Sequence, residues 1–286
     1  MKKVTLILGS GGARGYAHIG VIKELTSRGY QINSIVGSSI GAIIGAIYAS
    51  GELKKFEDWV TELDILNTIK FLDFSFLNSG IIKGNKIFTY IDENFLHKKN
   101  IEELNIPFIA VATDIINQRE VWFQNGKTID ALRASSAIPS VFVPYKINKK
   151  LYVDGGILNP VPILPIGLDK SDIIITVNLS GKENRSLTKR KRKKDSSLNI
   201  YNKAQEKIYQ FFKKDKNSLN TLKVMTKSLD IMQNALSQYK MAAYNSDISI
   251  NIPYNSAEFY EFHRAKDLIA IGREMAKNAI DEFEKS

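Results

Sequence analysis

The chain has 286 residues and contains no cysteine. This absence excludes disulfide bonds, thiolate metal sites and a cysteine nucleophile, and it fits a reducing compartment. Histidine is scarce as well, because His18, His97 and His263 are the only imidazole groups in the sequence. We expect neither a metal site nor a cofactor.

Long apolar runs are also missing. The longest weakly polar stretch, Ile40 to Ala49, has ten residues, whereas a membrane-spanning helix needs about eighteen or more. The apolar run Val4 to Leu8 follows two lysines as in a signal peptide, but it stops at Gly9 and is too short for one. We therefore expect a cytoplasmic protein, with any membrane contact peripheral and at the inner membrane surface.

Positive charge is concentrated in one segment. Lys182 to Lys194 contains eight basic residues and one acidic residue, so it carries a net +7 of the total charge of +10. Such a block is usually a solvated loop. It could also attract the headgroups of an anionic membrane. Nucleic acid is an unlikely partner, because no recognisable base-reading element accompanies the basic residues.

Two βα units open the chain. Val4 to Leu8 and Ile32 to Val36 are predicted strands, and each leads through a glycine-containing turn into a helix, the second spanning Ile40 to Ser50. Consecutive βα units predict a parallel sheet with helices on its faces. Ile173 to Asn178 has the apolar composition of a central strand. An antiparallel strand pair is expected from Phe108 to Phe123.

We expect one domain over residues 1–286, with a basic linker at 181–198 and a helical insertion at about 199–244. The helix predicted from Ser218 to about Ala243 has an apolar stripe, expected to pack against the domain more readily than against a membrane. The stripe consists of Leu222, Met225, Leu229, Met232, Leu236 and Tyr239. Both this helix and the aromatic run Phe71 to Leu77 fit an apolar lid or the core, and the sequence leaves the two alternatives open.

The segment Gly37-Ser38-Ser39-Ile40-Gly41 lies between a predicted strand and a predicted helix. A Gly-x-Ser-x-Gly turn of this kind can expose its serine as a nucleophile, and Gly37 and Gly41 stand where a sharp elbow needs residues without side chains. Alternatively, Ser39 only caps the helix.

The glycine-rich turn from Gly9 to Gly15 also has two interpretations. A dinucleotide-binding loop is disfavoured, because Arg14 occupies the third glycine position of that motif and the second strand ends without an acidic residue. The turn suits an oxyanion hole better. Backbone amides of Gly11 and Gly12 would point at the developing negative charge, and Arg14 would add positive potential or hold the loop.

A nucleophilic serine needs a base. His18 is expected on a helix face and His97 in an exposed loop, so His263 is the only histidine in the Ser-Asp-His order of common α/β-hydrolases. Asp154 is the competing base, because it ends a predicted strand and two glycines follow it.

Four segments together resemble the patatin-like phospholipase family, a group that includes bacterial serine acyl hydrolases. They are the glycine-rich turn, the Ser39 pentapeptide, Ala134-Ser135-Ser136-Ala137-Ile138-Pro139 and Asp154-Gly155-Gly156. The resemblance covers Lys3 to about Leu179 well and Lys182 to Tyr244 poorly. One departure is Ser10, where many members carry another glycine.

The resemblance implies a three-layer α/β/α fold with a mostly parallel central sheet, followed by C-terminal helices. It further implies a Ser39–Asp154 dyad without histidine, an oxyanion hole at Gly11 and Gly12 with Arg14 nearby, and hydrolysis of phospholipids, lysophospholipids or simpler esters through an acyl-enzyme. The alternative is a catalytically silent, lipid- or membrane-binding regulatory module of the same fold. The substrate, its acyl-chain length and the oligomeric state do not follow from the sequence.

Overall fold

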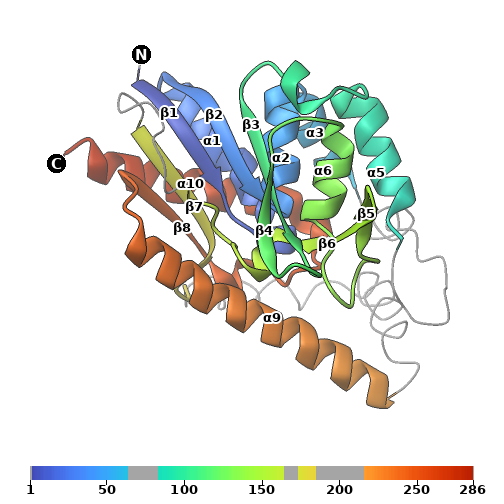
Figure 1. Ribbon diagram of the computed structural model, residues 1–286. Coiled ribbons are helices and arrows are strands. Elements are labelled where there is room, and N and C mark those ends of the chain that lie inside the picture. Colours follow the sequence, from blue (N-terminus) through green and yellow to red (C-terminus); the bar gives the residue numbers. More distant parts are fainter. Residues whose placement is uncertain (1, 64–82, 164–172, 185–215, 286) are drawn as a thin grey trace.

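The computed structural model describes residues 2–63, 83–163, 173–184 and 216–285 (Figure 1). The aromatic run Phe71 to Leu77, most of the basic linker and the first part of the predicted helical insertion, residues 199–215, lie outside these residues. The described strands form one eight-stranded sheet in the order β5-β6-β3-β2-β1-β7-β8, with β4 paired to β3. Their bounds are β1 Lys2–Leu8, β2 Tyr30–Ser38, β3 Phe108–Asp114, β4 Arg119–Phe123, β5 Tyr145–Ile147, β6 Lys150–Asp154, β7 Ile173–Gly181 and β8 Ile248–Pro253.

The sheet has a parallel part and an antiparallel part. Strands β3, β2, β1, β7 and β8 run parallel to their neighbours, which confirms the predicted parallel sheet. Strands β4, β6 and β5 join it in antiparallel pairs at the β3 end. The three-residue strand β5 was not predicted.

Seven α-helices are formed by the described residues: α1 Ala17–Ser27, α2 Ile40–Ser50, α3 Leu53–Glu62, α5 Asn85–Ile91, α6 Thr128–Ser135, α9 Lys216–Ala243 and α10 Ala265–Phe283. The bounds of α2 are the predicted ones. At the end of α2, Gly51 has φ 91°, the left-handed conformation expected of a residue that terminates a helix. No helix within the described ranges is long and apolar enough to cross a membrane.

The two faces of the sheet are covered differently. Leu6 and Leu8 of β1 belong to the large apolar core that includes buried residues of α1, α2 and α10. On the other face, Ile7 packs with Val161 and Ile163, and Met241 and Tyr244 at the C-terminal end of α9 join this smaller cluster. In Figure 1, α1 and α10 lie behind the sheet and α9 in front of it, so the α/β architecture with C-terminal helices is confirmed.

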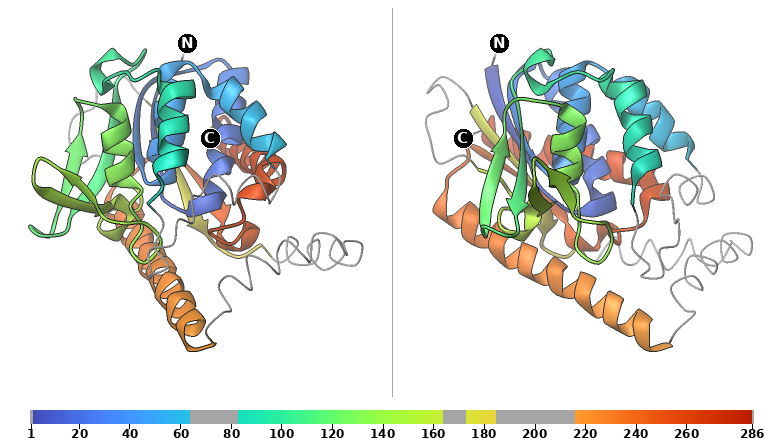
Figure 2. Two further views of the ribbon diagram at one scale, coloured as in Figure 1. Left: turned by 90° about the vertical axis from the view of Figure 1, so that its right-hand side faces the viewer. Right: turned by 45° about the vertical axis from the view of Figure 1, so that its right-hand side comes forward.

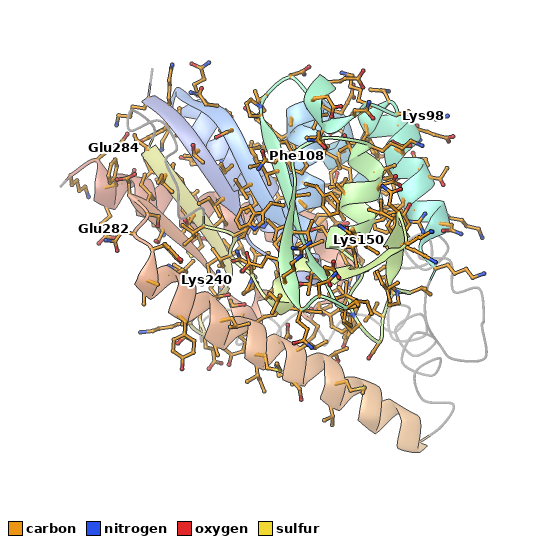
Figure 3. The ribbon with its side chains drawn as sticks, in the orientation of Figure 1. Lys98, Phe108, Lys150, Lys240, Glu282 and Glu284 are labelled. Carbon is orange, nitrogen blue, oxygen red and sulfur yellow. The ribbon has the colours of Figure 1, made fainter. Side chains whose placement is uncertain are left out.

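Helices α1 and α10 cross at a short distance. A Cβ atom at Gly20 would lie 2.0 Å from the carbonyl oxygen of Ile269, and one at Gly272 would lie 2.0 Å from that of Ala17. Glycine at both positions therefore allows the two backbones to touch. Beyond the end of α10, Glu284 binds Lys2 of β1 at 3.1 Å, so the beginning and the end of the chain meet here (Figure 3).

The orientation of α9 differs from the prediction. Met225, Met232 and Tyr239 were expected to pack against the domain, but they are 50%, 56% and 73% exposed. The helix instead turns polar residues inward: Asp230 binds Arg14, and Lys240 binds Glu120 of β4. Figure 3 labels Lys240 on α9. We call its exposed apolar side the outer face of α9, made of Val224, Met225, Ile231, Met232, Ala235, Tyr239 and Ala242.

Candidate active site

Ser39 stands at a sharp turn between β2 and α2. Its backbone angles are φ 55° and ψ −123°, a conformation that non-glycine residues rarely adopt. A Cβ atom at Gly41 would lie 2.2 Å from the Leu8 carbonyl oxygen, and one at Gly37 would lie 2.5 Å from the Ala42 nitrogen. The flanking glycines are therefore required by close backbone contacts, as a nucleophile elbow demands.

The side chain of Ser39 does not cap α2, because no side-chain capping hydrogen bond forms there. Its hydroxyl instead donates a short hydrogen bond to the Asp154 carboxylate. The Ser39 amide donates to the Ser135 hydroxyl at 2.9 Å, and that hydroxyl donates to the Val111 carbonyl oxygen at 2.6 Å. Ser135 thus ties the strained turn to β3. The capping interpretation of Ser39 is wrong.

Strand β3 brings Ser39 and Asp154 together. Val111 of β3 pairs with Ser38, and the next residue, Ala112, pairs with Asp154 of β6. Ser38 and Asp154 therefore pair with neighbouring residues of β3. Strand β6 continues along the same edge of β3 from the point where β2 ends. The contact is tight, since a Cβ atom at Gly155 would lie 2.1 Å from the Val111 carbonyl oxygen.

Asp154 is completely buried. Burial raises the pKa of its carboxyl from 3.8 to about 7, and the hydrogen bonds from Ser39 and from the Gly156 amide oppose this shift. The Gly156 amide donates to the second carboxylate oxygen at 2.7 Å and fixes its orientation. A carboxylate with a pKa near neutrality can accept a proton from a serine hydroxyl and return it, as general acid–base catalysis requires.

The glycine-rich turn follows β1 at the same edge of the sheet. Neither the Gly11 amide nor the Gly12 amide donates a hydrogen bond to another described residue, whereas the Ser10 amide donates to Pro160. Gly12 and Ser39 line the same pocket. Two free amides in this position could stabilise an oxyanion formed beside Ser39.

The guanidinium of Arg14 makes no hydrogen bond to Ser39. Its guanidinium donates to the Tyr254 carbonyl oxygen at 3.1 Å and to the Asp230 carboxylate of α9 at 3.1 Å, and the residue is 4% exposed. Of the two roles expected for Arg14, these contacts support holding the loop.

All three histidines lie within the described ranges, and none of them makes a hydrogen bond to Ser39 or Asp154. His97 binds Glu52 at 3.0 Å and is partly exposed, as expected. His18 lies on α1, as expected, and is fully buried. Its ring binds the Gly9 carbonyl oxygen at 2.9 Å. Burial lowers the pKa of His18 to about 4, so the ring is neutral at pH 7.

His263 lies in the helical turn Phe262–Arg264, and burial lowers its pKa. Its neighbour Phe262 lines the pocket, but no hydrogen bond connects His263 to the Ser39–Asp154 pair. A Ser-Asp-His arrangement is therefore not formed.

The pocket beside Ser39 is mainly apolar. Its walls come from the turn at Gly12, from α2, α3 and α5, and from the segment after α6. The apolar side chains that line it are Tyr16, Ile40, Ile43, Phe56, Trp59, Leu63, Ile87, Phe88, Ile91, Ile138, Phe142 and Phe262. Such a lining suits a hydrocarbon chain.

Some features of the site were not predicted. Ser135 belongs to the segment Ala134 to Pro139, but the sequence did not indicate that its hydroxyl binds the Ser39 amide. The sequence also did not indicate that Asp230 binds Arg14. The described residues contain no cluster of three or more histidine or acidic side chains that could hold a metal ion.

Comparison with known proteins places the chain in a family. The family model described as patatin-like phospholipase matches residues 6–166. An uncharacterized NTE family protein of Mycobacterium tuberculosis is 34% identical over 333 aligned positions, covering 99% of this chain and 92% of that protein. A lysophospholipase NTE1 of Cryptococcus neoformans var. neoformans is 30% identical over 199 positions, covering 65% of this chain and 12% of that protein.

Among solved structures, VipD from Legionella pneumophila aligns with a TM-score of 0.46 and 16% identity over 97% of this chain and 67% of that chain. The family assignment rests on the sequence matches. The family model spans more than half of the sequence, and the mycobacterial relative aligns along nearly all of it. The chain therefore belongs to the patatin-like phospholipase family, a family of lipid acyl hydrolases.

Proposed function

We propose that this protein hydrolyses carboxylic esters of lipids with a Ser39–Asp154 dyad. The Ser39 hydroxyl attacks the ester carbonyl carbon while its proton moves to the Asp154 carboxylate. The tetrahedral oxyanion collapses, and the alcohol leaves with the proton from Asp154. Water then attacks the acyl-Ser39 ester and gives a proton to Asp154, and this proton returns to Ser39 as the fatty acid leaves.

The observation that carries this proposal is the hydrogen bond from the Ser39 hydroxyl to the buried Asp154 carboxylate at an apolar pocket. The pocket suits the acyl chain, and the free amides of Gly11 and Gly12 suit the oxyanion. A silent lipid-binding module would not need a strained serine paired with a buried acid, because both features cost folding free energy.

The direct test is covalent labelling with a fluorophosphonate probe followed by gel electrophoresis. We expect the wild-type protein to be labelled and Ser39→Ala to remain unlabelled, because the probe reacts with an activated serine. Hydrolysis of a short soluble ester should disappear in the same variant. A wild-type protein that binds lipid vesicles but is neither labelled nor active would contradict the proposal.

The pH dependence of turnover follows from the pKa of Asp154, about 7. Only the ionised carboxylate can accept the serine proton, so kcat/KM for a soluble ester should fall about tenfold per pH unit below pH 7. The melting temperature measured at each pH is the control for unfolding. A flat profile down to pH 5 would show that Asp154 is not the base.

Removing His263 distinguishes the dyad from a triad. We expect His263→Ala to retain kcat within about threefold, because a general base contributes about 10²–10⁴-fold and His263 does not contact the Ser39–Asp154 pair. His18→Ala is a poor substitute for this test, since it removes the buried hydrogen bond to Gly9. Equal damage in His263→Ala and Ser39→Ala would support a triad instead.

A further inference from the structure

The outer face of α9 is an exposed apolar stripe. Val224 is 63% exposed and Ile231 61%, in addition to the methionines and Tyr239 described above. The stripe residues recur at spacings that place them on one side of a helix. They include five of the ten large apolar side chains that the described part of the chain exposes. A contiguous surface of this kind marks an interaction site more often than isolated exposed residues do.

The opposite side of α9 is fixed to the protein by polar contacts. Asp230 binds the buried Arg14, Gln233 accepts a hydrogen bond from Ser10 at 3.5 Å, and Ser237 is 1% exposed. Turning the apolar stripe inward would break these contacts and leave the Arg14 guanidinium without its carboxylate. The stripe therefore faces outward in the folded protein.

The location of α9 relates this stripe to the candidate active site. Ser10 and Arg14 follow the carboxyl end of β1, the edge of the sheet where Ser39 also lies. In Figures 1 and 2, α9 crosses obliquely in front of the sheet, and its N-terminal part projects beyond the sheet. The middle of α9, at Asp230 and Gln233, therefore lies beside the turn that follows β1.

The charge of this region suits an anionic surface. Helix α9 contains four lysines and one aspartate, and the charged residues whose side chains are described, Lys227, Asp230 and Lys240, do not belong to the outer face. The basic segment Lys182 to Lys194 precedes α9 in the same connection between β7 and β8. Basic residues beside an amphipathic helix are attracted to anionic lipids, and the apolar side enters the headgroup region.

We propose that the outer face of α9 docks the protein on an anionic lipid surface. This proposal rests on the proposed function in one respect, the choice of lipid as the partner that binds the outer face of α9. Docking would place the carboxyl edge of the sheet next to a source of lipid esters. It does not require turnover, so binding can be measured with the inactive Ser39→Ala protein.

The test is cosedimentation of the Ser39→Ala protein with phosphatidylcholine vesicles, with and without phosphatidylglycerol. We expect binding that increases with phosphatidylglycerol and decreases with salt. Adding Val224→Ser, Ile231→Ser and Met232→Ser should weaken binding about tenfold to a hundredfold, because each side chain loses apolar area buried in lipid. Ile116→Ser, which changes a 70% exposed isoleucine in the turn after β3, is the matched control and should bind normally.

Two results would overturn the docking proposal. One is equal vesicle binding by the triple-serine protein and its parent. The other is a parent that elutes as a dimer and a triple-serine protein that elutes as a monomer in size-exclusion chromatography, which would make the outer face a contact between copies. In the active background, the triple variant should still hydrolyse a short soluble ester, which separates this proposal from the proposed function.

The contact between Asp230 and Arg14 carries a second inference. Arg14 lies in the turn Gly12–Tyr16, two residues after Gly12, and Asp230 is its only carboxylate partner among the described residues. We infer that Asp230 is a positioning residue that keeps Gly11 and Gly12 oriented toward the oxyanion.

Kinetics on a soluble ester test this inference. Asp230→Asn should lower kcat about tenfold with little change in KM, since losing one oxyanion donor completely costs about a hundredfold or more. Asp230→Glu should recover part of the loss. Lys240→Gln, which breaks the contact of α9 with Glu120, should keep kcat. Normal kcat in Asp230→Asn, or an equal loss in Lys240→Gln, would show that Asp230 only stabilises the helix.

Discussion

Replacing Asp154 by asparagine is expected to lower kcat for ester hydrolysis by about 10²–10⁴-fold, the usual contribution of a general base. Asparagine has the same shape and can keep both contacts, accepting from the Gly156 amide and donating to the Ser39 hydroxyl. It cannot accept the serine proton. Steady-state kinetics on a soluble ester, together with the rate of fluorophosphonate labelling, measure the loss.

The same substitution should make the protein more stable at pH 8. The pKa of Asp154 is about 7 in the folded state and close to 3.8 in the unfolded chain. The folded state therefore holds the extra proton between these pH values, and the free energy of unfolding falls as pH rises through them. Above pH 7 the buried carboxylate costs at most on the order of 4 kcal/mol, which asparagine removes.

Asp114→Asn is the matched control. Asp114 has no exposed surface, and its carboxylate accepts hydrogen bonds from the Asn117 amide at 3.1 Å and from its side chain at 2.8 Å. These bonds hold the pKa of Asp114 below its ordinary value. We expect this variant to lose thermal stability and keep kcat, the opposite pattern to Asp154→Asn. Full activity in Asp154→Asn would rule out the dyad.

Alanine at Gly20 or Gly272 is expected to destabilise the protein by roughly 2 kcal/mol. The new methyl group meets backbone on the facing helix, so α1 and α10 must separate, and overpacking of this kind costs about 1–3 kcal/mol or more. Alanine gains about 1 kcal/mol of helix propensity over glycine, which offsets only part of the cost. Urea denaturation of the purified protein measures the difference.

A double variant gives a sharper result. Once the first methyl group has separated the helices, the second meets less resistance, so Gly20→Ala and Gly272→Ala together should cost less than the sum of their separate effects. Lys277→Ala on the exposed side of α10 should change stability by less than about 0.5 kcal/mol. Strict additivity, or unchanged stability in the single variants, would mean that the helices do not touch at these glycines.

The elbow could be predicted from the sequence because its constraints are local. Gly37 and Gly41 flank Ser39 within five residues, and both lack side chains because the backbone passes so close. Asp154 could be proposed as a partner because a strand ending in two glycines places its side chain at the sheet edge. The sequence could not show that β3 aligns the two, since strand register depends on residues far apart in the chain.

The outward stripe of α9 shows a limit of periodicity. The spacing of its apolar residues correctly indicates a helix with two different sides. The spacing alone does not indicate which side of the helix faces the protein. In this protein the polar side of α9 faces inward, because Arg14, Ser10 and Glu120 form hydrogen bonds or ion pairs with it. Gly20 and Gly272 could not be paired either, because 252 positions separate them in the sequence.

The crossing of α1 and α10 has a consequence for synthesis of the protein. The ribosome releases β1, α1 and the Ser39 elbow early, but the helix that covers α1 is made more than 200 residues later. Until then the buried side of α1 has no partner, and the nascent chain exposes it to water and chaperones. Contacts this far apart also slow folding. The candidate active site is therefore expected to form only after residues 265–283 have left the ribosome.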